Sequence, residues 1–196
     1  MKLNHLLYST SIICALTISG CARKTVTRVN PDQQIDLSGR WNDTDSRLVA
    51  EEMTQDALGK NWRSNFVDKN GKNPVIIIGI ITNKSHEHIE PETFIKDMEK
   101  EFIKSGLIRI VQNSVFREKV REERADQQEF AALETQKKWG KELGADFMVF
   151  GNINSIVDAE GKRKVIYYQV NLELTNMETN EIVWIGEKKI KKYVTN

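Results

Sequence analysis

The residues best able to do chemistry lie close together in His86-Glu87-His88-Ile89-Glu90-Pro91-Glu92. In an extended backbone His86 and His88 project to the same side, so the two imidazoles could chelate zinc. A closed zinc site needs four ligands, and Asp or Glu would have to complete it, because the only other histidine is His5, near the N-terminus. We therefore favour a loop or helix-capping role and expect no metal site, with zinc binding as the alternative.

Other catalytic patterns are missing from the sequence. No serine stands in a Gly-x-Ser-x-Gly motif, and Gly39, Gly71 and Gly79 lack the spacing of a phosphate-binding loop. Neighbouring carboxylates such as Glu51 and Glu52 diverge by about 100° if they lie on a helix, which is typical of solvated charges. The sequence thus predicts a protein that is not an enzyme and holds no cofactor.

The most specific chemistry is covalent, at Cys21. The residues Ile18-Ser19-Gly20-Cys21 resemble a bacterial lipobox, in which small residues fit the peptidase and the cysteine sulfur accepts a lipid. We predict cleavage between Gly20 and Cys21 and lipid attachment at Cys21. Ala22, where Asp would retain a lipoprotein in the inner membrane, resembles the enterobacterial signal for the outer membrane. An ordinary secretory signal with a coincidental cysteine is the alternative.

The residues before Cys21 have the pattern of a secretory leader. Lys2 supplies a positive charge, and the apolar run 6–18 is too short for a comfortable membrane span. We expect residues 1–20 to be removed as a signal peptide. Because Cys14 is lost with this peptide, Cys21 is left without a disulfide partner.

Charge and length limit the remaining classes of function. The chain carries 29 Lys and Arg against 28 Asp and Glu, and loss of Lys2 with the leader makes the charges balance. A neutral protein lacks the electrostatic footprint of nucleic-acid binding. The mature chain of about 175 residues suits one domain with a proper core. Residues 21–41 are polar and without period, so we expect a lipidated flexible tether there and a globular domain over 42–196.

Hydrophobic periodicity predicts the order of the helices and strands. Apolar spacings of three and four predict helices over 44–61, 91–105, 114–129 and 133–143. Beta-branched or alternating runs predict strands over 74–81, 107–111, 147–157, 164–174 and 181–190. The order predicts an α+β fold, a mixed sheet of about five strands with flanking helices and three antiparallel strands at the C-terminal end.

Details of these elements follow from single residues. The run 74–81 is expected to be a central strand buried on both faces, and the charged run 117–129 a solvated helical face. Trp62 and Trp139 are expected to face the core. Gly144 is predicted to cap the helix that precedes it.

Four aromatic side chains lie on the predicted C-terminal strands, namely Tyr167, Tyr168, Trp184 and Tyr193. An exposed aromatic side chain on a strand is a good anchor for a partner protein. Packing in the core or pairing across strands is the interpretation that we favour.

Four stretches resemble the penicillin-binding protein activator LpoB family. They are DLSGRWNDTDS (36–46), NKSHEHIEPE (83–92), GKELGADFMVFG (140–151) and the tail 168–191. Together they span essentially the whole predicted domain. The resemblance implies a fold related to the N-terminal domain of TolB and to the curli secretion lipoprotein CsgG.

The resemblance also implies a function. It implies a monomeric outer-membrane lipoprotein that faces the periplasm and binds a non-catalytic regulatory domain of a class A penicillin-binding protein. Binding would stimulate peptidoglycan synthesis, and the partner-binding residues are not assigned. Two alternatives stay open: a CsgG-related component of an envelope assembly or secretion apparatus, and a metal-dependent enzyme built on His86 and His88.

Overall fold

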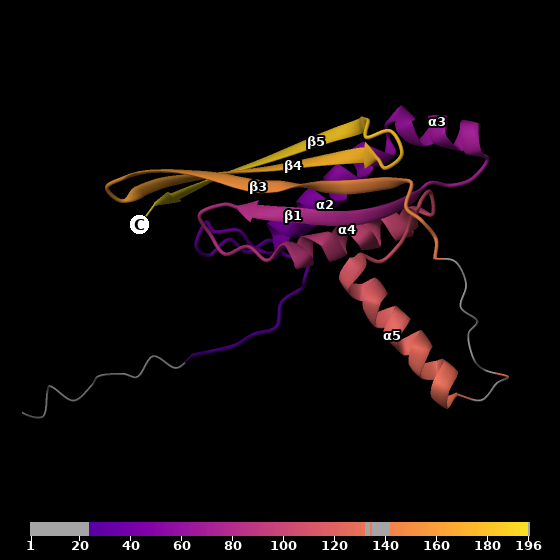
Figure 1. Ribbon diagram of the computed structural model, residues 1–196. Coiled ribbons are helices and arrows are strands. Elements are labelled where there is room, and N and C mark those ends of the chain that lie inside the picture. Colours follow the sequence, from indigo (N-terminus) through magenta and orange to yellow (C-terminus); the bar gives the residue numbers. More distant parts are fainter. Residues whose placement is uncertain (1–23, 132–133, 135–141, 196) are drawn as a thin grey trace, which may run out of the picture. The chain divides into compact units, whose positions relative to one another are not determined.

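The computed structural model (Figure 1) describes residues 24–131, 134 and 142–195. The chain divides into two units, Met1–Gln33 and Gln34–Asn196. In the first unit, Asn30 accepts hydrogen bonds from the backbone N–H groups of Asp32 and Gln33, which forms a short turn. The predicted leader with Gly20 and Cys21 lies outside the described residues, and so does Trp139 with most of the helix predicted over 133–143.

The second unit contains four helices and five strands within its described residues, which confirms the predicted α+β class. In chain order the elements are α2 (Asp43–Leu58), α3 (Asn61–Asn70), β1 (Val75–Lys84), α4 (Pro91–Ser105), β2 (Arg109–Ile110), α5 (Ser114–Phe130), β3 (Phe147–Glu160), β4 (Arg163–Asn176) and β5 (Ile182–Thr195). The strands form one mixed sheet in the order β2-β1-β3-β4-β5. β1 is parallel to β2 and β3, whereas β3, β4 and β5 are antiparallel, as predicted.

Helix α2 begins at the position that its sequence predicts. The side chain of Asn42 accepts a hydrogen bond from the backbone N–H of Asp45, and the Asp45 side chain accepts one from the backbone N–H of Asn42. This reciprocal capping satisfies two N–H groups that the start of a helix would otherwise leave unpaired. Helix α4 likewise begins at Pro91 and ends before Gly106, whose φ of 67° only glycine adopts easily.

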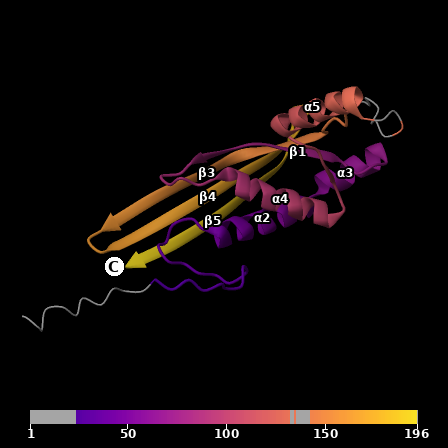
Figure 2. The ribbon, with the colours of Figure 1, turned by 90° about the horizontal axis from the view of Figure 1, so that it is seen from below.

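Helices α2 and α4 cover one face of the sheet, and Figure 2 shows them side by side beneath the strands. They bury apolar residues at a spacing of four, namely Val49, Met53 and Ala57 of α2 and Phe94, Met98 and Phe102 of α4. Alternate strand residues such as Ile76, Ile153 and Leu172 meet them and are fully buried. This removal of apolar surface from water is the main stabilising contribution to the fold.

Two predicted details are confirmed, the burial of Trp62 and the solvated face of α5, although Trp62 lies on a different helix than expected. Trp62 is buried, but it belongs to α3, a separate helix that the sequence analysis did not predict. Its indole N–H donates to the carbonyl of Ala57 at 2.7 Å, and its ring meets Phe147 edge-on at 5.1 Å. The charged helix α5 has no buried residue, as expected of a solvated face.

Two other predictions are wrong in part. Strand β1 is buried on both faces only over residues 75–78, because Ile80 is 78% exposed on the side away from α2 and α4. A run of apolar residues cannot indicate how far along the strand its two faces are covered by other elements. Residues 142–145 have no regular structure, so the helix predicted over 133–143 does not include residues 142 and 143; most of that helix, which Gly144 is predicted to cap, lies outside the described residues.

Candidate protein-binding face

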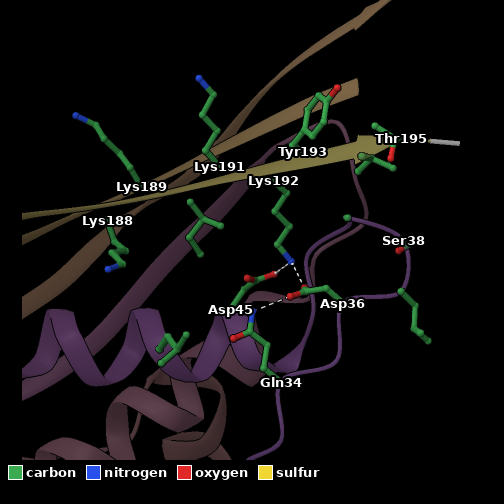
Figure 3. A pocket seen from close by; sticks show the side chains of 15 residues that line it. Gln34, Asp36, Ser38, Asp45, Lys188, Lys189, Lys191, Lys192, Tyr193 and Thr195 are labelled. Carbon is green, nitrogen blue, oxygen red and sulfur yellow. Dashed lines mark hydrogen bonds and ion pairs between the residues drawn. The ribbon is translucent and has the colours of Figure 1, made fainter. Parts of the chain in front are cut away.

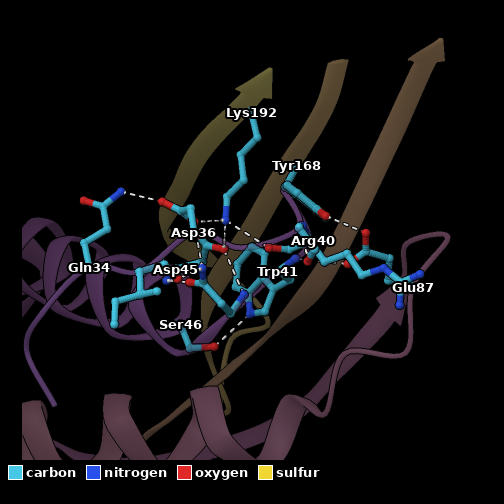
Figure 4. Close-up of polar contacts among 12 residues, drawn as sticks. Gln34, Asp36, Arg40, Trp41, Asp45, Ser46, Glu87, Tyr168 and Lys192 are labelled. Carbon is cyan, nitrogen blue, oxygen red and sulfur yellow. Dashed lines mark hydrogen bonds and ion pairs between the residues drawn. The ribbon is translucent and has the colours of Figure 1, made fainter. Parts of the chain in front are cut away.

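The predicted His86–Glu92 cluster spans the end of the loop between β1 and α4 and the first two residues of α4, and its Glu87 makes contacts with distant segments (Figure 4). The Glu87 carboxylate accepts hydrogen bonds from the Tyr168 hydroxyl at 2.8 Å and from the backbone N–H of Trp41 at 3.0 Å. Tyr168 is fully buried, and this burial together with the Glu87 carboxylate raises the pKa of its hydroxyl. Glu87 thus ties the loop to β4 and to the segment before α2.

The two histidines of this loop lie in different surroundings. His86 Nδ1 lies 2.6 Å from Ser155 Oγ, and His86 Nε2 lies 3.2 Å from a Glu87 oxygen. His88 is exposed. Among residues 24–131, 134 and 142–195, no three His, Cys, Asp or Glu side chains come close enough to hold a metal ion. The contacts of His86 fasten the loop to β3.

A second polar cluster surrounds Lys192 of β5, whose side chain is only 11% exposed. Its ammonium donates to Asp45 at 2.6 Å, to Asp36 at 2.9 Å and to the carbonyl of Arg40 at 3.0 Å. Burial alone would lower the pKa of Lys192, but the hydrogen bonds to both carboxylates outweigh it and raise this pKa. Hydrogen bonds from Gln34 and Lys192 hold the pKa of Asp36 at about 2.

These contacts correct the predicted boundary between tether and domain. The polar sequence predicts a tether that extends through residue 41, but the folded unit begins at Gln34. Asp36 pairs with Lys192, and Trp41 meets Tyr168 edge-on with ring centroids 5.5 Å apart. Local sequence gives no sign of this, because Lys192 lies 156 positions beyond Asp36.

The face of the sheet turned away from α2 and α4 carries a different set of side chains, and we call it the open face. Residues paired across neighbouring strands share a face, so the register groups them in rungs. Across β3, β4 and β5 these rungs are Phe150–Glu173–Ile185, Asn152–Asn171–Glu187, Asn154–Gln169–Lys189, Ile156–Tyr167–Lys191 and Asp158–Val165–Tyr193.

Exposed apolar side chains stand at both ends of this series of rungs. Near the β3–β4 turn, Ile156 is 66% exposed and Tyr193 is 64% exposed. At the other end Ile80 and Ile185 are 78% and 64% exposed, and Ile80 lines a shallow hollow of about 480 Å³ with Phe150. Single exposed apolar residues are common, but a sheet face that repeats them in neighbouring rungs favours contact with another protein.

A row of amide side chains separates the two apolar ends. Asn152 Oδ1 accepts hydrogen bonds from the side-chain amides of Asn154 and Asn171. Gln169 donates to Asn171 at 3.0 Å and to Glu187 at 2.6 Å. Asparagine is disfavoured in strands, so a row of amides on adjacent strands is not explained by strand propensity. The row gives the open face a polar centre with ordered donors and acceptors.

The structure separates the four aromatic residues of the C-terminal strands. Tyr168 and Trp184 are buried, which confirms the core interpretation for these two, and the Trp184 indole donates to Asp56 at 2.7 Å. Tyr167 is half-buried and Tyr193 is exposed, both on the open face. Alternation along β4 and β5 could have indicated this division, since odd-numbered residues there face away from the helices.

The described part of the chain has a broad, partly apolar sheet face that could contact another protein. None of the described helices is both long and apolar enough to cross a bilayer. A family model described as "Peptidoglycan-synthase activator LpoB" matches residues 45–190. The chain belongs to the LpoB family of peptidoglycan-synthase activators.

Several solved structures are similar to this chain at low sequence identity. The C-terminal domains of LpoB from Salmonella enterica and Escherichia coli are each 12% identical, with TM-scores of 0.40 and 0.42, and each match covers 76% of this chain and 99% of that domain. Lipoprotein GNA1162 from Neisseria meningitidis is 11% identical with a TM-score of 0.39, over 61% of this chain and 83% of its own. No curated protein matches the sequence.

The Lys192 cluster predicts a stability effect. Replacing Lys192 with Met leaves the carboxylate of Asp45, which is 8% exposed, without its cation. We expect the free energy of unfolding to fall by at least about 2 kcal/mol in urea denaturation. Lys188→Met is the matched control on the same side of β5, because its partner Glu52 is 60% exposed, and we expect a loss of less than about 1 kcal/mol. Equal losses would contradict the structural role of Lys192.

The low pKa of Asp36 predicts a pH dependence. Its pKa falls from 3.8 to about 2 on folding, so its stabilising contribution is present above pH 3.8 and is lost as the pH falls towards 2. In Asp36→Asn this group no longer titrates. We expect the variant to show a smaller decrease in stability than the unchanged protein between pH 4 and pH 2, measured by urea denaturation at each pH. Parallel pH curves would disprove the prediction.

Proposed function

We propose that this chain is a lipoprotein held to the outer membrane by a lipid on Cys21, and that its folded unit binds and activates a class A penicillin-binding protein. The observation that carries the proposal is the match of residues 45–190 to the family of peptidoglycan-synthase activators. The lipobox-like residues before Cys21 support the anchor. The protein in this proposal works as a monomer and has no active site of its own.

The open face is the surface that we assign to the synthase. Its exposed Ile156 and Tyr193 can enter pockets of a partner, and the amide row between the apolar ends can exchange its solvent contacts for polar contacts across an interface. The partner is the regulatory domain of the synthase, as the family resemblance implies. Such binding activates an enzyme only if it favours the active conformation over the inactive one.

The length of the anchor segment limits where the partner can lie. Since the folded unit begins at Gln34, residues 21–33 would form the tether, and fully extended they reach at most about 45 Å. The start of the folded unit at Gln34 must therefore lie within this distance of the anchoring membrane, and the synthase domain must reach the open face from there. This is a tighter limit than the tether predicted over 21–41 would set.

The anchor can be tested by replacing Cys21 with Ser. A serine hydroxyl does not accept the lipid, so we expect the variant to be lost from the outer membrane, where the unchanged protein stays. Mass spectrometry of the unchanged protein should show acyl chains on an N-terminal Cys21. An unmodified N-terminus that still contains residues 1–20 would refute the anchor.

Activation can be tested with the purified synthase of the same organism in an assay of glycan polymerisation. Ile156→Asp places a charge at one apolar end of the proposed contact, and we expect binding to weaken at least about tenfold and stimulation to be lost at matched concentration. Ile103→Asp on α4 is the matched control, since Ile103 is 62% exposed and lies on a helix that covers the other face. It should stimulate normally. Tight binding without any change in the rate of glycan polymerisation would contradict activation.

A further inference from the structure

Strand β5 forms an edge of the sheet and pairs only with β4 in the part of the chain that the structure describes. It has 14 residues, whereas β2 at the other edge has two. Proteins usually shorten or cover edge strands, because their unpaired N–H and C=O groups can pair with another chain. Among the described segments, none other than β4 forms a backbone–backbone hydrogen bond with residues 188–195.

A groove of about 670 Å³ follows this edge (Figure 3). Its lining includes every residue from Lys188 to Thr195. Figure 3 shows Lys189, Lys191 and Tyr193 on one side of β5, and Lys192 on the other. A hollow that touches side chains from both sides of one strand lies along the edge of that strand and not on a face.

The opposite wall of the groove comes from the N-terminal part of the folded unit. Leu37 and Gly39 of the segment before α2, and Leu48 of α2 itself, line it. Leu37 is 92% exposed and Leu48 is 42% exposed, so both have apolar surface to bury. The Lys192–Asp36 ion pair holds this wall next to β5.

The two sides of the edge differ in charge. On the side of α2, the ammonium groups of Lys188 and Lys192 are each neutralised by carboxylates, and Ile190 and Val194 lie between and beside them. On the side of the open face, Lys191 has no carboxylate partner among the described residues, and Lys189 pairs only with Glu187. The first side therefore has no unpaired lysine and carries Ile190 and Val194 among its ion pairs, and the second is basic.

We propose that the edge of β5 binds an extended acidic peptide segment of a partner protein, which adds to the sheet as a sixth strand. Its backbone would pair with the free N–H and C=O groups of residues 188–195, which is a general mode of peptide recognition. Side chains on adjacent strands share a face. Every second residue of the bound segment is therefore apolar and packs beside Ile190, Val194 and Leu48, and the residues between them are acidic and face Lys189 and Lys191.

The four lysines of this edge have a second explanation, because lysine on an edge strand also prevents aggregation. A purely protective edge has no need of a groove with an apolar wall beside it. The two explanations differ in a measurable way, since a protective edge binds no strand and a recognition edge binds one of a particular pattern.

The experiment uses the full-length protein in detergent and fluorescein-labelled peptides with capped ends. We expect the alternating peptide (Val-Asp)₄ to bind at least about tenfold more tightly than (Val-Lys)₄ in fluorescence polarisation, because charge complementarity separates them. Lys189→Glu/Lys191→Glu should reverse this preference. Lys100→Glu/Lys104→Glu on the exposed side of α4 makes the same change of charge and should leave it intact.

Hydrogen exchange locates the bound peptide. Backbone amides within residues 188–195 should exchange more slowly with (Val-Asp)₄ bound, as new backbone hydrogen bonds require. The proposal is overturned if neither peptide binds, if both bind equally, if the protected amides lie elsewhere, or if light scattering shows that the edge is occupied by a second copy of the chain. The Ile156→Asp variant should bind (Val-Asp)₄ normally, so this test is independent of the test of synthase activation.

Discussion

Two helices cover one face of a five-stranded sheet, and this constraint shapes the rest of the molecule. Burial of one face against α2 and α4 provides the apolar core, in which Ile153, Leu172 and Phe94 are fully excluded from water. The same arrangement leaves the rungs of the opposite face in contact with solvent over β3, β4 and β5. It also leaves β5 as a long edge within the described residues. The surfaces that we assign to partners are thus consequences of how the core is covered.

Polar residues complete the fold at one end of this core. Glu87 accepts hydrogen bonds from segments distant in sequence and Lys192 donates hydrogen bonds to them, and each contacts the segment 36–41. Buried polar groups are costly unless they are paired, so the two clusters hold the segment in a defined position. The His86–Glu92 motif joins its loop to the sheet through the contact of His86 with Ser155 and through Glu87. Its carboxylate is engaged with Tyr168 and Trp41.

Strand β5 contributes to the side that faces the helices, to the open face and to the edge of the sheet, because successive side chains point to opposite faces. Trp184 and Lys192 point towards the helices, and Ile185, Lys191 and Tyr193 point to the open face. The backbone between them is free along the edge in the described part of the chain. In the functions that we propose, the open face contacts a peptidoglycan synthase and the edge receives an acidic strand. Both act by binding, which agrees with membership of a family of activators.

The sequence by itself determined the features that depend on local pattern. Apolar spacing indicated α2 and α4, alternation indicated β3, β4 and β5, and the residues of the family resemblance led to the family that the match over 45–190 shows. The tertiary structure alone decided where the folded unit begins, because Asp36 and Trp41 are held by Lys192 and Tyr168, far along the chain. It also decided that Ile80 lies beyond the cover of the helices. Residue type and period are local properties, whereas burial depends on which distant element lies opposite, and no local pattern carries that information.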